Sequence, residues 1–305
     1  MMWSQSECFL VIVIIYSAID SILQSGVSIS QIPTSYKRGD YIVRDFLGEM
    51  IGTFLLVLFG IGSVAVTILF SAHVGLFQIA MIWGIGVALA IYATRHLSCA
   101  HLNPAVSIAM VVGGRMNLRQ LPLYVVAQFV GAFLAAGVVF LLFSDSISQF
   151  EVLNHIVRGM PSSIQTAKMF GEFFNNAGGV MMVTVLTAFL SEAIGTFILV
   201  FLIFSLTEGC NIGRPDDTLA PFFIGLTVTV IISVFAPLTQ AGLNPARDLA
   251  PRVFSMIVGW GWAAMPSGSL IVYVMGPIVG GSLAALLFTQ VIEPTMKIGK
   301  GSCSC

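Results

Sequence analysis

The sequence predicts an all-α membrane protein, with six transmembrane helices and two short re-entrant half-helices arranged as an inverted repeat. The first observation is the composition: 57% of the 305 residues are hydrophobic and only 9% are charged, whereas soluble domains carry about 25% charged residues. The second is a set of apolar runs long enough to cross a bilayer. The third is a pattern that recurs in the two halves of the chain, each with one Asn-Pro-Ala triplet.

The N-terminal residues 1–43 precede the first long apolar run. Their apolar stretch, CFLVIVIIYSAI, is about a dozen residues long, and a spanning helix needs roughly 20. The basic start of a signal peptide is also missing. We therefore expect a cytoplasmic or interfacial extension, with an uncleaved signal or anchor as the alternative.

Six apolar runs follow, and each is long enough to cross the hydrocarbon core of a bilayer as a helix. The first Asn-Pro-Ala triplet lies between the second and third runs, and the other lies between the fifth and sixth. The expected spans lie near residues 45–70, 77–96, 119–143, 183–206, 219–239 and 269–292.

The two halves of the chain are related by sequence. FLGEMIGTFLLV (46–57) and FLSEAIGTFILV (189–200) agree at nine of twelve positions. Three spans per half is an odd number, so the halves must cross the membrane in opposite orientations. Inverted repeats of this kind place a binding or permeation site where broken helices from both halves meet, near the bilayer midplane.

Each Asn-Pro-Ala triplet predicts a helix start at membrane depth. Asn is a preferred N-cap residue, and Pro is favoured at the first helical position because no backbone donor is needed there. Irregular backbone inside a membrane is tolerated only where it is buried in protein or lines water. Each helix start carries about +0.5 of an elementary charge, so two facing starts should repel cations while the Asn amides donate hydrogen bonds to a hydroxyl or water. The motif residues are Asn103, Pro104, Ala105, Asn244, Pro245 and Ala246.

The distribution of Lys and Arg predicts that both termini are cytoplasmic. With the N-terminus inside, nine of the 13 basic residues lie on the cytoplasmic side, as the positive-inside rule requires. The expected organisation is a cytoplasmic extension (1–43), a first repeat (44–145), an extracellular connecting loop (146–182), a second repeat (183–293) and a cytoplasmic tail (294–305).

The motifs AHLNPAV, NPARD and GWG, with the repeat around them, resemble the aquaporin (major intrinsic protein) family. The resemblance covers about residues 44–293 and is closest to aquaglyceroporins, the glycerol facilitators. It implies the aquaporin fold and a passive channel for glycerol, other small uncharged solutes and water, with ions and protons excluded. It also implies a homotetramer with one pore per subunit, and we expect a multi-pass protein of the plasma membrane.

The same resemblance implies a second constriction, formed by Trp83, Ile232, Ala241 and Arg247. An Arg at the bilayer centre costs about 2.5–3.5 kcal/mol, which favours a side chain that faces water. The indole and the aliphatic side chain would form an apolar wall opposite the guanidinium, whose N–H groups donate to hydroxyls. Asp248 resembles the acidic residue of the glycerol-conducting branch; in the first turn of its helix it is favourable with the dipole and can hold the loop.

Two positions depart from the glycerol facilitators, which have Gly at the position of Ile232 and an aromatic residue at that of Ala241. The combination is more similar to plant nodulin-type channels, so a channel for urea, metalloid hydroxides or lactic acid is an alternative. Water-selective members usually have His where this chain has Ile232, so a strictly water-selective pore is disfavoured.

The extended residues before each Asn should turn their carbonyl groups toward the conduit. Glu49 and Glu192 occupy equivalent places in the repeat, which favours loop support through backbone N–H groups; a proton relay is the other interpretation. The carbonyl groups are those of Cys99, Ala100, His101 and Leu102 in the first half, and of Gln240, Ala241, Gly242 and Leu243 in the second.

Other function classes find little support. The sequence has no nucleophile–base–acid set, metal-ligand spacing or phosphate-binding loop, so we expect no enzyme, cofactor or metal site. The net charge of −1 gives no indication of nucleic acid; the expected partners are the lipid bilayer, glycerol and water. A secondary transporter remains the alternative class, because inverted repeats and broken helices serve transporters as well.

Overall fold

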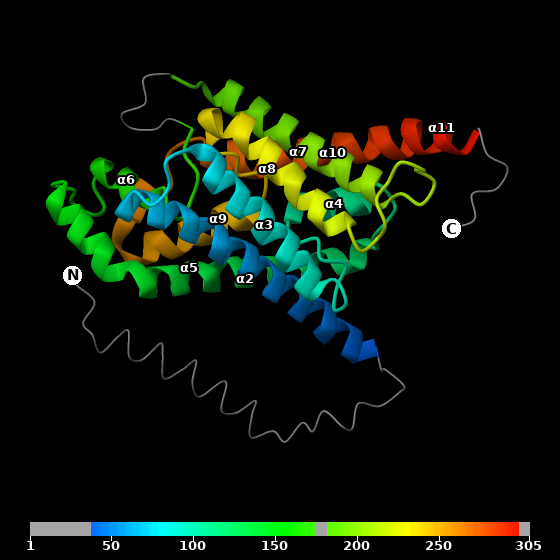
Figure 1. The fold of residues 1–305 in the computed structure, drawn as a ribbon. Coiled ribbons are helices and arrows are strands. Elements are labelled where there is room, and N and C mark those ends of the chain that lie inside the picture. The colour runs from blue at the N-terminus through cyan, green and yellow to red at the C-terminus, as the bar shows by residue number, and fades with distance from the viewer. Residues whose placement is uncertain (1–37, 175–181, 299–305) are drawn as a thin grey trace. The chain divides into compact units, whose positions relative to one another are not determined.

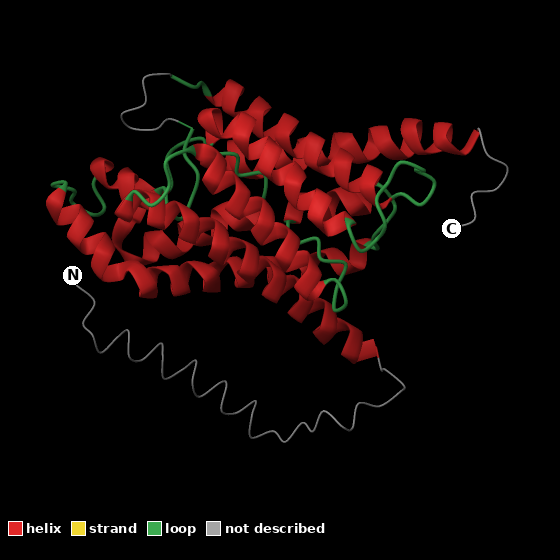
Figure 2. Ribbon diagram, in the orientation of Figure 1, coloured by secondary structure: helices red, strands yellow, loops and turns green. Residues whose placement is uncertain are grey.

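The computed structural model describes residues 38–174 and 182–298, and its secondary structure within those ranges is entirely helical (Figure 2). The chain divides into a short unit, Met1–Tyr41, and a large one, Ile42–Cys305. The expected cytoplasmic extension lies almost wholly outside the described residues.

Within the described part of the chain, six helices are long and apolar enough to cross a membrane, which confirms the predicted fold class (Figure 1). The sixth is assembled from consecutive helical segments that include two wider turns. The six are α2 (Arg38–Phe70), α3 (Leu76–Thr94), α5 (Leu121–Leu153, preceded by η2, Leu118–Gln120), α7 (Val185–Thr207), α8 (Ala220–Thr239) and η6 (Ile271–Met275) with α10 (Gly276–Leu287), η7 (Phe288–Ile292) and α11 (Glu293–Ile298).

The two half-helices are α4 (Pro104–Val112) and α9 (Pro245–Ser255). They have nine and eleven residues, so at about 1.5 Å per residue they cross roughly half of a bilayer core. The remaining short elements are η3 (Pro161–Ser163) and α6 (Ile164–Ala167) in the connecting segment, and η4 (Met256–Trp260) and η5 (Gly261–Ala264) after α9.

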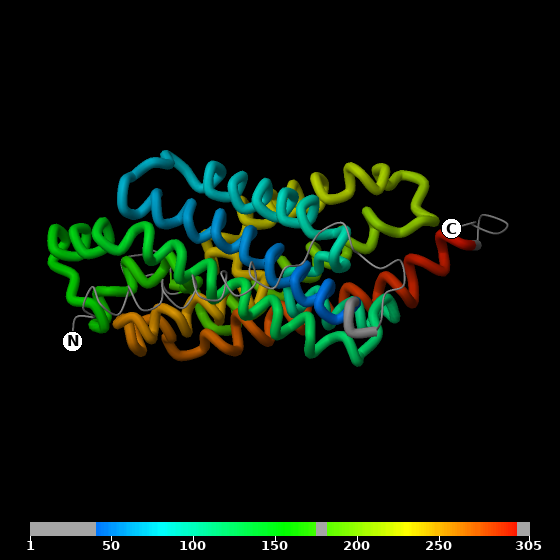
Figure 3. Tube along the Cα trace, turned by 90° about the horizontal axis from the view of Figure 1, so that it is seen from below, coloured from blue at the N-terminus to red at the C-terminus, as the bar shows by residue number. Residues whose placement is uncertain are grey.

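Glycines in equivalent helices let the backbones approach closely. Helices α3 and α8 lie side by side (Figures 1 and 3), and a Cβ on either Gly84 or Gly225 would overlap the carbonyl oxygen of the other. In the same way, a Cβ on Gly131 of α5 would overlap the carbonyl oxygen of Met50 in α2, and a Cβ on Gly280 of α10 would overlap that of Ala193 in α7. The Gly131–Met50 and Gly280–Ala193 contacts occupy equivalent positions in the two repeats, so the two halves pack in the same way.

Three boundaries differ from those expected. Residues 38–43 are the first turns of α2 rather than extension. Helix α5 continues ten residues beyond its predicted end at 143, to Leu153. Its last turns are held by Ile147, which is fully buried, and by Glu151, which pairs with Arg158 at 2.8 Å.

The C-terminal boundary also differs, because residues 294–298 continue the last helix. Glu293 accepts from Lys297 one turn later at 2.6 Å and from Arg115 at 2.9 Å. Arg115, which follows α4, also pairs with Glu208 after α7 at 2.8 Å. The start of the tail is therefore joined through Glu293 to Arg115 of the first half, and Arg115 in turn is joined to Glu208 of the second half.

Candidate functional site

The two half-helices meet at their N-termini, and each is capped by the Asn of its triplet. The side chain of Asn103 accepts from the Ala105 N–H at 2.9 Å, and that of Asn244 accepts from the N–H groups of Ala246 and Arg247 at 3.1 and 3.2 Å. Pro at the first helical position needs no such acceptor. The N-cap function predicted for both asparagines is confirmed.

The caps also join the two halves to each other. Asn103 Nδ2 donates to the Leu243 carbonyl at 2.9 Å, and Asn244 Nδ2 donates to the Leu102 carbonyl at 2.8 Å. A carboxamide has two N–H donors. Each Asn donates one of them to the opposite loop, and the second remains available to another acceptor.

The loops that precede the two asparagines have an unusual backbone. Ala100, Leu102, Ala241 and Leu243 all adopt positive φ, between 49° and 59°. Such a conformation costs about 1–3 kcal/mol per non-glycine residue and persists only where the surroundings enforce it. The same positions in both loops are affected, so the enforcing contacts should be equivalent as well.

Those contacts come from two buried carboxylates. Glu49 Oε1 accepts from the His101 N–H at 2.9 Å, and Oε2 accepts from the Leu102 N–H at 2.8 Å. Glu192 accepts from the N–H groups of Gly242 and Leu243 at 2.9 and 2.7 Å. Both glutamates have no exposed surface. Contacts of this kind suit loop support.

The carboxylates determine where the loop carbonyls point. In a trans peptide the N–H and the preceding C=O point in opposite directions. When the N–H groups of His101 and Leu102 point at Glu49, the carbonyls of Ala100 and His101 therefore point away from it. In the same way, the carbonyls of Ala241 and Gly242 point away from Glu192 because the N–H groups that follow them donate to it. All four residues line the central cavity.

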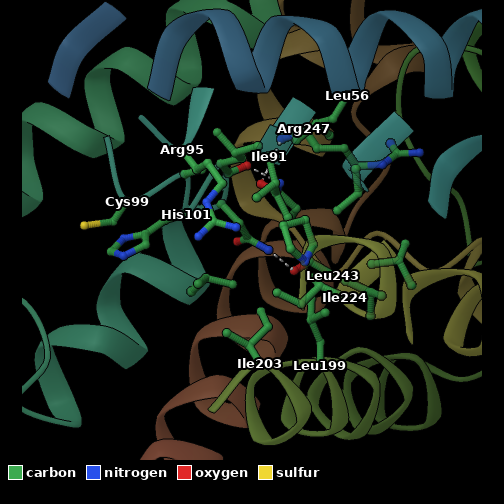
Figure 4. Close-up of a pocket in the computed structure, with 18 of the residues that line it drawn as sticks. Leu56, Ile91, Arg95, Cys99, His101, Leu199, Ile203, Ile224, Leu243 and Arg247 are labelled. Carbon is green, nitrogen blue, oxygen red and sulfur yellow. Dashed lines mark hydrogen bonds between the residues drawn. The ribbon is translucent and has the colours of Figure 1, made fainter. Parts of the chain in front are cut away.

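That cavity has a volume of about 420 Å³ and lies between the helices of both halves. Its lining includes the exposed residues Arg95, Arg115, Thr207 and Asp217, which mark one mouth, the Arg95 mouth, and it also includes the buried Arg247. Figure 4 shows apolar side chains around the polar groups. The apolar lining includes Leu56, Ile91, Leu199, Ile203, Ile224 and Val228.

The cavity brings together most of the predicted site residues. All four proposed filter residues line it, as do both asparagines and the predicted carbonyl residues except Gln240. The Gln240 side chain instead accepts from the Phe173 N–H at 2.8 Å. Pro104, Ala105, Pro245 and Ala246 are buried behind the asparagines, and Glu49, Glu192 and Asp248 also lie outside the lining.

The Trp83–Arg247 pair differs from the sequence interpretation, which has the indole and the guanidinium on opposite sides of the solute path. Here Arg247 Cζ lies 4.1 Å from the Trp83 ring centroid, which is van der Waals contact. A buried cation is attracted to the face of an indole.

The structure adds one residue that the sequence analysis missed. Glu172, in the connecting segment, forms an ion pair with Arg247, and both side chains are at most 5% exposed. The signal in the sequence was an isolated acid among apolar residues, MFGEFF, like the surroundings of Glu49 and Glu192. Its partner could not be read from the sequence because the connecting segment has no counterpart in the repeat.

Comparisons with known proteins agree with this geometry. The family model described as "Major intrinsic protein" matches residues 37–288. The glycerol uptake facilitator protein of Pseudomonas aeruginosa is 42% identical over 241 residues, which are 79% of this chain and 84% of that protein. The protein of the same name from Escherichia coli K12 is 40% identical over 250 residues, which are 81% and 87% of the two chains.

A solved structure shows the same arrangement. The X-ray structure of the aquaglyceroporin from Plasmodium falciparum matches with a TM-score of 0.74 and 27% identity, over 84% of this chain and 99% of that one. Six membrane-spanning helices, two capped half-helices that meet end to end and a family match over most of the sequence lead to one conclusion. The chain is a multi-pass membrane protein that belongs to the major intrinsic protein family.

Proposed function

We propose that the chain is a passive channel for glycerol and other small uncharged solutes, together with water, and that ions and protons are excluded. The cavity supports this most directly, because it runs from the Arg95 mouth past both N-cap asparagines to Arg247. A polyol suits its lining, with an apolar side for the carbon backbone and a line of backbone carbonyls and amides for the hydroxyls. Two similar proteins are named glycerol uptake facilitators.

The proposed mechanism exchanges hydrogen bonds with water for hydrogen bonds with the protein. Hydroxyls donate to the carbonyls of Ala100, His101, Ala241 and Gly242, and they accept from the free amide N–H groups of the two asparagines. Cations meet two helix N-termini, each with about +0.5 of a charge, and the loops offer them no carboxylate because both are turned toward backbone donors. Trp83, Ile232, Ala241 and Arg247 would set which solutes enter.

We also propose the arrangement in the membrane. Arg95, Arg115 and Arg214 lie around the ends of α3, α4 and α7, so the positive-inside rule favours the Arg95 mouth as the cytoplasmic one. The repeats 44–145 and 183–293 would then be joined outside the cell by the segment 146–182. The assembly would be a homotetramer in the plasma membrane, which cross-linking in intact membranes would test.

Stopped-flow light scattering on proteoliposomes tests the solute. We expect glycerol permeability well above that of empty liposomes. Trp83→Ala should raise the permeability to five-carbon polyols at least about threefold, because removal of the indole opens the constriction, and about 0.7 kcal/mol of barrier corresponds to that factor. Trp262→Ala is the matched control, since that indole is 79% exposed. Water flux without glycerol flux would contradict the proposed solute, and saturable, ion-coupled uptake would indicate a secondary transporter.

A second experiment tests ion exclusion at Arg247. In Arg247→Val the buried Glu172 carboxylate loses its cation, so the constriction becomes negative. The attraction between this carboxylate and a cation about 4 Å away is on the order of 4 kcal/mol at an intermediate dielectric. We therefore expect the proton leak, measured with a pH-sensitive dye inside proteoliposomes, to rise at least about tenfold. Arg119→Val, at an exposed arginine, should leave the leak unchanged. An unaltered leak in Arg247→Val would place the ion barrier elsewhere.

A further inference from the structure

We propose that Gly60 of α2 determines the width of the selectivity filter, because its missing side chain forms the slot in which the indole of Trp83 lies. Gly60 does not itself line the cavity. It is a positioning residue, which acts on the solute through Trp83. The inference rests on the proposed function, in which Trp83 belongs to the constriction that selects solutes.

The slot is defined by what a side chain at position 60 would meet. A Cβ on Gly60 would overlap Cε3, Cζ3 and Cη2 of Trp83, three consecutive carbons of the six-membered ring. The overlap would be nearly equal for all three carbons, so the Cβ would lie over the face of the ring and not beside its edge. One face of the indole therefore packs on the α2 backbone at Gly60.

The helix that carries Trp83 is fixed by its neighbours. On one side of Trp83 in the chain, Gly84 meets α8, where a Cβ would overlap the Gly225 carbonyl. Two residues further on, a Cβ on Gly86 would lie only 3.3 Å from Phe59 Cβ in α2. Interiors packed this closely have no free volume into which a helix could retreat. A side chain at position 60 would therefore displace the indole itself, by rotation about its side-chain bonds.

A displaced indole would narrow the constriction. The guanidinium carbon of Arg247 lies 4.1 Å from the centroid of the Trp83 ring, which is van der Waals contact. Both side chains line the cavity. A ring that is pushed off Gly60 therefore moves against Arg247 or into the cavity, and both movements reduce the aperture. Water is smaller than glycerol, so a narrower aperture impedes glycerol more than water.

The internal repeat provides a comparison, because the residues that contact one another at the filter differ from their counterparts together. The counterparts follow from the alignment of 46–57 with 189–200 and of the two Asn-Pro-Ala triplets. The pairs are Gly60 with Ile203, Trp83 with Ile224, and Arg247 with Val106. All three counterparts line the cavity. An aromatic side chain thus stands on α3 where α2 has Gly, whereas α7 and α8 each have Ile, so the residue at position 60 is matched to the indole.

The test is the ratio of glycerol to water permeability in proteoliposomes of the full chain, measured by stopped-flow light scattering. This ratio does not depend on how much of the protein is folded. We expect Gly60→Ala to lower it about fivefold, which corresponds to about 1 kcal/mol of additional barrier for glycerol. Gly62→Ala is the matched control in the same helix, because a Cβ there would meet no heavy atom within 4 Å. It should keep the wild-type ratio.

A double variant distinguishes positioning of the indole from general packing of α2. In Trp83→Ala the overlapped ring is gone, so the addition of Gly60→Ala should leave the ratio of Trp83→Ala unchanged, as two changes that act only through one contact require. An equal loss in the Trp83→Ala background would overturn the inference, because Gly60 would then act through helix packing. A ratio in Gly60→Ala that equals or exceeds that of the wild type would overturn it as well.

The double variant also decides the matter if Gly60→Ala alone yields no folded protein. Recovery of folded protein with the permeability ratio of Trp83→Ala would support the inference, because removal of the ring then removes the overlap. A double variant that still does not fold would overturn it. The proposed function is tested separately by the wild type: absence of glycerol flux there would overturn the function and the inference together.

Discussion

Replacing Glu49 with Leu should abolish the channel. The carboxylate accepts from four buried donors: the N–H groups of His101 and Leu102, Ser98 Oγ at 2.8 Å and Gln128 Nε2 at 2.8 Å. Each buried donor left unsatisfied costs about 1–3 kcal/mol, and the whole stability of a domain is typically about 5–15 kcal/mol. We expect little folded protein, and glycerol permeability at least about tenfold below wild type in the protein that is recovered.

Two variants make this result interpretable. Glu49→Gln keeps the volume and one accepting oxygen, so it should lose less activity than Glu49→Leu. Asp145→Leu replaces an exposed acid in the same half of the chain and should behave as wild type. Both permeability per folded molecule and thermal unfolding would be measured. Wild-type glycerol permeability in Glu49→Leu would mean that the loop holds its positive-φ conformation without the carboxylate.

The second large effect is expected at Gly280. A Cβ added there would lie 2.6 Å from the Ala193 carbonyl carbon and 2.8 Å from its Cα. These are backbone atoms, so no side-chain rotation relieves the overlap and α10 must move away from α7. Overpacking of this kind costs about 1–3 kcal/mol or more. Gly280→Ala should lower the unfolding temperature by several degrees, and Gly280→Val should prevent stable folding.

Gly62 in α2 provides the control, because a Cβ there would meet no heavy atom within 4 Å. Ala is favoured over Gly in a helix by about 0.5–1 kcal/mol, so Gly62→Ala should be at least as stable as wild type. Gly131→Ala, the repeat-related position that faces the Met50 carbonyl, should be destabilised like Gly280→Ala. If Gly280→Ala and Gly62→Ala unfold at the same temperature, the close α7–α10 contact does not limit stability.

The elements that the sequence predicted well are those specified by neighbouring residues. A run of apolar residues identifies a span regardless of its partners, and Asn-Pro-Ala identifies a capped helix start because the cap bonds reach only two or three residues along the chain. The ends of α2, α5 and α11 were missed for the converse reason. Polar turns beyond the membrane are stabilised by particular contacts, such as Glu151 with Arg158 or Glu293 with Arg115, which leave no periodic signal.

The candidate site divides in the same way. The two asparagines followed from motif and repeat, and Trp83, Ile232, Ala241 and Arg247 followed from the family resemblance. The contact between Trp83 and Arg247, the absence of Gln240 from the cavity lining and the ion pair of Arg247 with Glu172 are visible only in the folded chain. Each depends on segments far apart in the sequence and brought together by packing.

Hydrophobic length and helix capping are local properties, so the class of protein, the six spans and the two half-helices could be predicted from the chain alone, and the internal repeat added the inverted arrangement. The tertiary structure decided how the loops are held and what surrounds the filter arginine. Buried charges must find partners wherever the fold provides them, and here the connecting segment supplies Glu172, anchored by Asp248 and Arg252 of α9. Such a partner is chosen by three-dimensional proximity, and no pattern along the chain encodes it.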